Sequence, residues 1–130
     1  MRWLAAGERE LKGACGQGFL QGILLSEVSA PRYTTATERR IVMCDEVIRD
    51  RRGNVTGASI SLQVPWTRVC AYWLGVVPFP PDMWREGHEG EVIVLSLEPE
   101  AADGRDIVVW PQTDAWMAAL TAMGVPELND

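Results

Sequence analysis

Hydrophobic and polar residues alternate most regularly over residues 55–64, VTGASISLQV. Every second residue from Ala58 to Val64 is apolar, and this period of two predicts a strand with one buried face. The preceding run 41–50, IVMCDEVIRD, opens with four apolar residues, which is typical of a strand covered on both faces. The connection RRGN contains a Gly-Asn pair that tolerates positive φ. Together the two runs predict a hairpin.

Further strands are predicted along the rest of the chain. Residues 19–28, FLQGILLSEV, favour a strand, and 68–77, RVCAYWLGVV, is another strand candidate. Residues 91–98 and 106–110 form two apolar runs on either side of PEAADGR, so we expect a second hairpin there. The polar run 29–37, SAPRYTTAT, is predicted to be a loop.

The C-terminal part carries the clearest helix signal. Thr113 or Asp114 can cap a helix on which Trp116, Leu120 and Met123 share a face, and Gly124 ends it. The tail after this glycine, residues 125–130, is expected to fray.

The N-terminal part gives a weaker helix prediction. Residues 2–12 place Leu4 and Leu11 on one helical face, and Glu8 precedes Lys12 by four residues, the favourable order for an ion pair. Gly7 weakens the prediction, and the glycines that follow, up to Gly22, indicate a turn.

This order of elements predicts the α+β class. We expect a mainly antiparallel sheet of about six strands with a C-terminal helix across one face, and a further helix at the N-terminus as an option. The alternative is a β-roll or sandwich with a terminal helix. Residues 1–124 are expected to form one domain, since 130 residues with 47% hydrophobic content can bury a core without metal or disulfide.

Targeting signals are not expected. The first twelve residues lack the apolar stretch of a secretory signal, and the longest apolar run, 69–79, is too short for a membrane helix. We therefore expect a soluble, cytoplasmic protein that does not bind a membrane.

Charge is distributed unevenly. Residues 1–80 carry ten basic and seven acidic side chains, whereas 81–130 carry two basic and eleven acidic ones, giving net charges of +3 and −9. Nucleic-acid binding depends on a basic excess, so we do not expect it. An acidic surface instead favours a basic partner.

The cysteines predict no metal site. Cys15, Cys44 and Cys70 are far apart in sequence, which favours free thiols. Asp45 and Glu46 follow Cys44, and their negative charge raises a thiol pKa, so a nucleophilic role is disfavoured. The glycines between Gly16 and Gly22 follow a charged segment and precede a strand, the reverse of a dinucleotide loop, and no cofactor is expected.

The only histidine, His88, lies among Glu86, Glu89 and Glu91. An imidazole with neighbouring carboxylates can perform acid–base chemistry or bind a metal. The flanking glycines favour a solvated turn, so an enzyme using His88 is the second hypothesis.

Aromatic residues are concentrated between positions 66 and 84. They are Trp66, Tyr72, Trp73, Phe79 and Trp84. Tyr72 and Trp73 are adjacent, and in a strand they would point to opposite faces. Aromatic side chains fill cores, but they also anchor interfaces and line apolar pockets.

These patterns favour a small cytoplasmic binding protein without chemistry of its own. The predicted face combines the five aromatic residues with an acidic rim that includes Asp82, Glu86 and His88. Its partner would be a basic protein or a cationic small molecule. A homodimer that uses the aromatic segment as its own interface is the third hypothesis.

Overall fold

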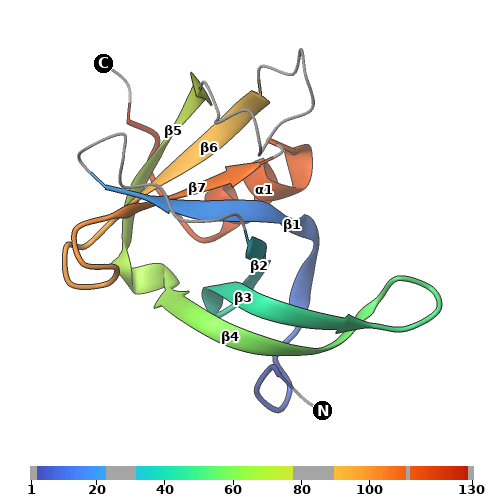
Figure 1. Cartoon of the computed structure of the whole chain (residues 1–130). Coiled ribbons are helices and arrows are strands. Elements are labelled where there is room, and N and C mark those ends of the chain that lie inside the picture. Colours follow the sequence, from blue (N-terminus) through green and yellow to red (C-terminus); the bar gives the residue numbers. More distant parts are fainter. Residues whose placement is uncertain (1–2, 23–31, 78–89, 111, 129–130) are drawn as a thin grey trace.

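The computed structural model describes residues 3–22, 32–77, 90–110 and 112–128. It contains seven strands and one α-helix in these ranges, which confirms an α+β fold with a C-terminal helix but gives one strand more than predicted (Figure 1). The elements are β1 (Glu10–Gln21), β2 (Arg32–Thr37), β3 (Arg40–Arg49), β4 (Val55–Pro65), the 3-10 helix η1 (Trp66–Arg68), β5 (Val69–Val77), β6 (Gly90–Leu97), β7 (Asp106–Trp110) and α1 (Asp114–Ala122).

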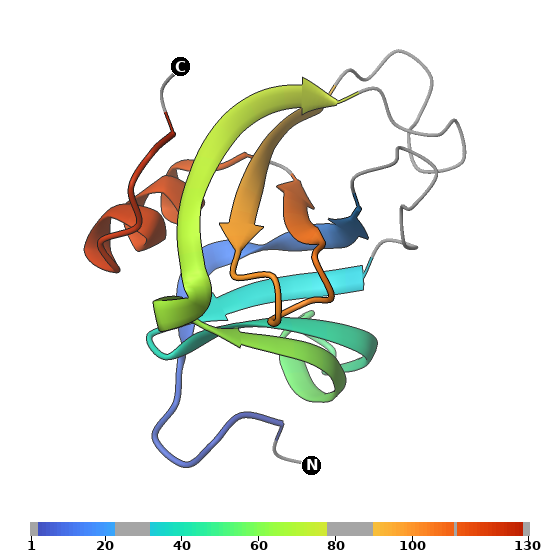
Figure 2. The same cartoon turned by 90° about the vertical axis from the view of Figure 1, so that its left-hand side faces the viewer.

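All seven strands form one antiparallel sheet in the order β4-β3-β2-β1-β7-β6-β5. The two edge strands, β4 and β5, are nevertheless consecutive in the chain and joined only by η1. A flat seven-stranded sheet is roughly 29 Å wide, and a three-residue link cannot span that distance. The sheet is therefore strongly curved, and β5 bends back over the core (Figure 2).

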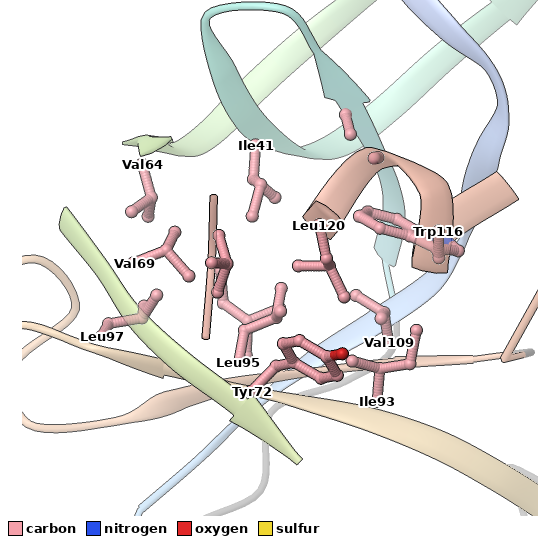
Figure 3. Packing of buried hydrophobic residues seen from close by; sticks show 14 of the residues in the cluster. Ile41, Val64, Val69, Tyr72, Ile93, Leu95, Leu97, Val109, Trp116 and Leu120 are labelled. Carbon is pink, nitrogen blue, oxygen red and sulfur yellow. The ribbon is translucent and has the colours of Figure 1, made fainter. Parts of the chain in front are cut away.

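The main core lies on the face of the sheet that carries α1. Trp116 and Leu120 of the helix are fully buried and belong to one cluster with inward residues of all seven strands (Figure 3). Thr113 caps the helix as predicted, because its Oγ1 accepts a hydrogen bond from the Trp116 amide at 3.2 Å. Gly124 has φ +71°, which only glycine adopts readily, and it directs the chain out of the helix.

The opposite face of the sheet is also buried. One cluster contains Phe19, Val92, Val94 and Val108, and another lies over β3 and β4. The apolar run at the start of β3 contributes to both sides, since Ile41 and Met43 lie in the main core and Val42 and Cys44 in the outer cluster. The prediction of a strand covered on both faces is confirmed.

Both predicted hairpins, β3–β4 and β6–β7, are present. The simple alternation predicted for β4 is wrong, because the register shifts beside Ser61. Met43 pairs with Leu62, but the next residue of β3, Cys44, pairs with Ile60. This bulge turns Leu62 into the main core and Ile60 into the outer cluster.

The predicted N-terminal helix and the turn after it are wrong. Residues 3–9 contain no helix, and β1 begins at Glu10 and runs through the glycines. Gly18 is required there, since a Cβ at this position would overlap the side chain of Thr34 on β2. The local Glu8–Lys12 pair gives way to a contact between Glu8 and distant Arg40.

The loop predicted over 29–37 is also wrong in its described part, since Arg32–Thr37 forms β2, an interior strand between β3 and β1. The hydroxyl groups of this strand have hydrogen-bond partners, which lets Thr35 and Thr37 be fully buried.

Among the described residues, no helix is long and apolar enough to cross a membrane.

Candidate functional site

Three of the eight predicted binding residues lie in the described structure. Trp66 and Tyr72 are buried in the main core, and Trp66 Nε1 donates a hydrogen bond to the Thr37 carbonyl at 2.7 Å. Trp73 on β5 is 36% exposed. The other five, Phe79, Asp82, Trp84, Glu86 and His88, lie outside the described residues. The binding role of the set therefore stays a prediction.

β5 presents adjacent aromatic residues to opposite faces, as predicted. Tyr72 pairs with Leu95 of the main core, whereas Trp73 pairs with Val94, which lies on the opposite face of the sheet in the cluster with Phe19 and Val108. Leu74, the next residue, is 39% exposed. Because β5 is an edge strand, these side chains lie at the border of the sheet and not within it.

The C-terminal segment covers part of the β5 edge. The Tyr72 amide donates to the Pro126 carbonyl at 3.0 Å, and the Leu128 amide donates to the Tyr72 carbonyl at 2.8 Å. Val125 is buried, while Leu128 is 52% exposed. These residues belong to the segment that was expected to fray, and their backbone continues the sheet by one parallel bridge.

Exposed large hydrophobic side chains gather at this edge. Four are found in the described part of the chain, and three of them are Trp73, Leu74 and Leu128; the fourth, Ile48, lies on the β3–β4 hairpin. We call Trp73, Leu74 and Leu128 the β5-edge patch.

Acidic side chains flank the β5-edge patch. Glu127 lies beside Tyr72, and exposed Glu91 on β6 pairs with Val76 further along β5. Neither carboxylate takes part in an ion pair in the described ranges. The patch therefore combines apolar surface with carboxylates that form no ion pair with any described residue.

A second concentration of polar chemistry lies on the outer face of β2. Tyr33, Thr35 and Thr37 point to this face with the period of two of a strand. Two carboxylates from the N-terminal part of the chain bind them: Glu8 accepts from Thr37 Oγ1 at 2.7 Å, and Glu10 accepts from Thr35 Oγ1 and Tyr33 Oη, both at 2.9 Å. We call these five residues with Arg40 the β2 polar network.

Glu8 is the most buried charge of this network. Its side chain is fully buried and receives two hydrogen bonds from the Arg40 guanidinium, at 2.8 and 2.9 Å, and one from the Ala5 amide. The Arg40 hydrogen bond is the main cause that lowers the pKa of Glu8 to about 2, against the opposing effect of burial. The carboxylate is thus held ionised and holds residues 5–8 on the sheet.

Tyr33 anchors the other end of the β2 polar network. Its ring contacts Trp3 edge-to-face with centroids 6.4 Å apart, and the Arg49 guanidinium lies 5.2 Å from the ring centroid. Burial, followed by the hydrogen bond to Glu10, raises the pKa of Tyr33. The phenol therefore stays protonated and donates to Glu10.

The Cys44 thiol is not activated. Burial, and then the charges of Glu10 and Asp45, raise the pKa of Cys44 to about 11, so it is not a thiolate at neutral pH. Cys15 pairs with Thr35 across one edge of β2 and Cys44 with Tyr33 across the other, so β2 separates the two thiols. Two strand spacings, about 10 Å, exceed the reach of a disulfide. All three cysteines are free.

A small pocket lies next to the β2 polar network. A pocket of about 200 Å³ lies beside Glu8, and small-molecule sites usually measure ~300–1,000 Å³. No group of three or more metal-binding side chains occurs in the ranges that the structure describes. The pocket is lined by Trp3, Leu4, Ala5, Gly7, Glu8 and Thr56.

Sequence reasoning missed the β2 polar network, although one signal was available. In RYTTAT, an aromatic and β-branched residues recur at every second position, which favours a strand. The buried hydroxyls needed acceptors 25 and 29 residues away in sequence, in Glu10 and Glu8. No local pattern indicates such partners.

No protein-family model matches the chain, and no curated protein shows significant sequence similarity to it.

Proposed function

We propose that this protein is a non-catalytic binding protein, that the β5-edge patch is part of its binding face, and that its partner is a basic protein. The observation that carries the proposal is the concentration of exposed Trp73, Leu74 and Leu128 at one edge of the sheet. The role of the five predicted residues outside the described ranges stays a prediction.

The physical case rests on the unequal distribution of apolar surface. Apolar rings in partly open positions are typical anchors of interfaces, since they bury a large area at a small cost in conformational entropy. The flanking carboxylates of Glu91 and Glu127 favour a partner of opposite charge, which would associate faster and with the correct orientation.

A homodimer through the same edge is the second candidate, and exposed Trp73 and Leu74 also favour it. Two copies joined there would bring like-charged carboxylates together, which disfavours self-association. Sedimentation at increasing protein concentration separates the two candidates. The alternatives of a cationic small molecule as ligand, and of an enzyme using His88, stay predictions, as does the cytoplasmic location.

A dye-labelled peptide provides the test. The probe is a nine-residue peptide in which Lys and Val alternate, and its counterpart alternates Glu and Val. We expect saturable binding of the Lys peptide, weakened by added salt, and no binding of the Glu peptide. Trp73→Ala should weaken binding about thirtyfold, as the loss of an interface anchor does.

Ile48→Ala is the matched control, because Ile48 is 55% exposed but lies on the β3–β4 hairpin. This variant should bind the Lys peptide as wild type does. Equal binding of both peptides, no binding of either, or full affinity in Trp73→Ala would contradict the proposal.

A further inference from the structure

In the part of the chain that the structure describes, the backbone of β5 has hydrogen-bonding groups without a partner at the edge of the sheet. In an antiparallel edge strand, the N–H and C=O groups of alternate residues point away from the neighbouring strand. Those of Tyr72 point outward, because they bond the C-terminal segment. Those of Leu74 therefore point outward as well, and the structure describes no hydrogen bond to either group.

This edge already accepts an extended backbone. Residues 126–128 run parallel to β5 and exchange two hydrogen bonds with Tyr72, at 3.0 and 2.8 Å. Within the described residues, the C-terminal segment does not pair with Leu74, although β5 itself continues to Val77. In the described ranges, β5 thus presents an unpaired strand edge next to the tail.

Exposed edges of this kind are templates for strand pairing. We propose that an extended basic segment of a partner protein binds as an additional strand along β5, starting at Leu74. This inference rests on the proposed function and specifies how the partner is held. Backbone hydrogen bonds would hold the segment, and alternate side chains would contact Trp73 on one face of the sheet and Leu74 on the other.

The negative charge near β5 favours a basic partner segment over a second copy of this acidic chain. Glu127 lies beside Tyr72 and Glu91 opposite Val76, so negative charge flanks both ends of the proposed strand site. The two positions on β5 are four residues apart, about 13 Å along the strand. Lysine or arginine side chains with similar spacing would meet both carboxylates, whereas a second acidic edge would be repelled.

Backbone methylation of the Lys–Val peptide tests the strand itself. Methylating one amide removes one donor without changing any side chain. We expect two alternating classes: methylation of an amide that faces β5 weakens binding about tenfold or more, and methylation of the intervening amides changes it less than twofold. Uniform sensitivity, or none, would overturn strand addition.

A protein variant gives an independent readout. Leu74→Pro removes the outward N–H but no hydrogen bond to β6, so an edge strand tolerates it better than a central strand would. Leu74→Ala shortens the side chain and keeps the N–H. We expect Leu74→Pro to bind the peptide about tenfold more weakly than Leu74→Ala, and equal affinity would overturn the proposal.

The outcomes separate the two proposals. If no Lys–Val peptide binds wild type, the proposed function itself fails. If the peptide binds, and Trp73→Ala weakens it, but methylation shows no alternation, the binding face stands and strand addition fails. The methylated peptides are measured on wild-type protein, so this distinction does not depend on the folding of any variant.

Discussion

The β2 polar network and the β5-edge patch both place carboxylates and an aromatic ring at the surface of one sheet, but they differ in what surrounds these groups. In the first, Glu8 and Glu10 have donors from the protein, and Tyr33 is held between Trp3 and Arg49. In the second, Glu91 and Glu127 have no ion pair in the described structure, and Trp73 remains one-third exposed.

The difference shows why unusual chemistry alone does not identify a site. The β2 polar network contains a carboxylate whose pKa is lowered to about 2 and has the more buried charges, yet its interactions are completed within the chain and fix the N-terminal segment. The β5-edge patch contains ordinary residues, but within the described ranges the backbone groups of Leu74 have no hydrogen-bond partner and Glu91 and Glu127 form no ion pair. We therefore assign stability to the first region, and the second is the one for which we propose recognition.

The largest expected effect is on the ion pair of the β2 polar network. Arg40→Met leaves the buried Glu8 carboxylate without its cation, and we expect the free energy of unfolding to fall by ~3–5 kcal/mol. Arg39→Met is the matched control, because Arg39 is exposed and lies 3.7 Å from exposed Glu38, so it should cost less than about 0.5 kcal/mol. Urea unfolding at pH 7 measures both. If both variants lost a similarly small free energy of unfolding, the β2 polar network would not stabilise the fold.

Acid should lower the free energy of unfolding by a comparable amount, because it protonates Glu8. The pKa of Glu8 falls from 4.5 to about 2 on folding, so its stabilisation is complete above pH 4.5 and is lost as the pH falls towards 2. The shift corresponds to about 3 kcal/mol. Unfolding experiments between pH 6 and 2 should show this loss in wild type and a shallower one in Glu8→Gln. Parallel pH profiles of the two proteins would refute the assignment.

A double-mutant cycle tests the bulge that separates the two faces of β4. Leu62→Ala should cost about 2 kcal/mol and couple by ~0.5 kcal/mol or more to Met43→Ala, its neighbour in the main core. Ile60→Ala should cost a similar amount, but its effect should add to that of Met43→Ala, because Ile60 lies on the outer face with Cys44. If Leu62→Ala and Ile60→Ala coupled equally to Met43→Ala, the two side chains would lie on one face and β4 would alternate without a bulge.

The smallest expected effect on stability is at the β5-edge patch. Trp73→Ala should lower the free energy of unfolding by about 1 kcal/mol, less than the ~3–5 kcal/mol typical of a buried tryptophan. Trp66→Ala, in the same segment but in the core, is the matched comparison and should show the larger loss. Equal losses would place Trp73 in the core and remove the apolar anchor from the proposed face.

The predictions that succeeded depended on local patterns. The β3–β4 and β6–β7 hairpins and α1 each carry their own turn or capping residue, such as Thr113 and Gly124. The opposite orientations of Tyr72 and Trp73 follow from strand geometry alone. In the candidate site, only the orientation of Trp73 could be predicted. It lies on the face opposite Tyr72 because adjacent residues of a strand point to opposite faces.

The predictions that failed depended on distant partners. A helix over residues 2–12 is favoured by the local spacing of Glu8 and Lys12, but Glu8 instead pairs with Arg40, 32 residues away. The polar sequence of β2 can lie inside the sheet because the hydroxyls of Tyr33, Thr35 and Thr37 donate to Glu8 and Glu10. The open edge of β5 results from the strand order, in which β5 is an edge although its sequence resembles a central strand.

The most direct test of this account is amide hydrogen exchange at Leu74, followed by NMR in free protein and with the Lys–Val peptide at saturation. We predict fast exchange in free protein, since the amide points outward without an acceptor, and at least tenfold slower exchange with the peptide bound. The amide of Trp73, which faces β6, should exchange slowly in both states. A Leu74 amide that is already protected in free protein, or that exchanges at the same rate with the peptide bound, would contradict the central claim that β5 is an open edge used for binding.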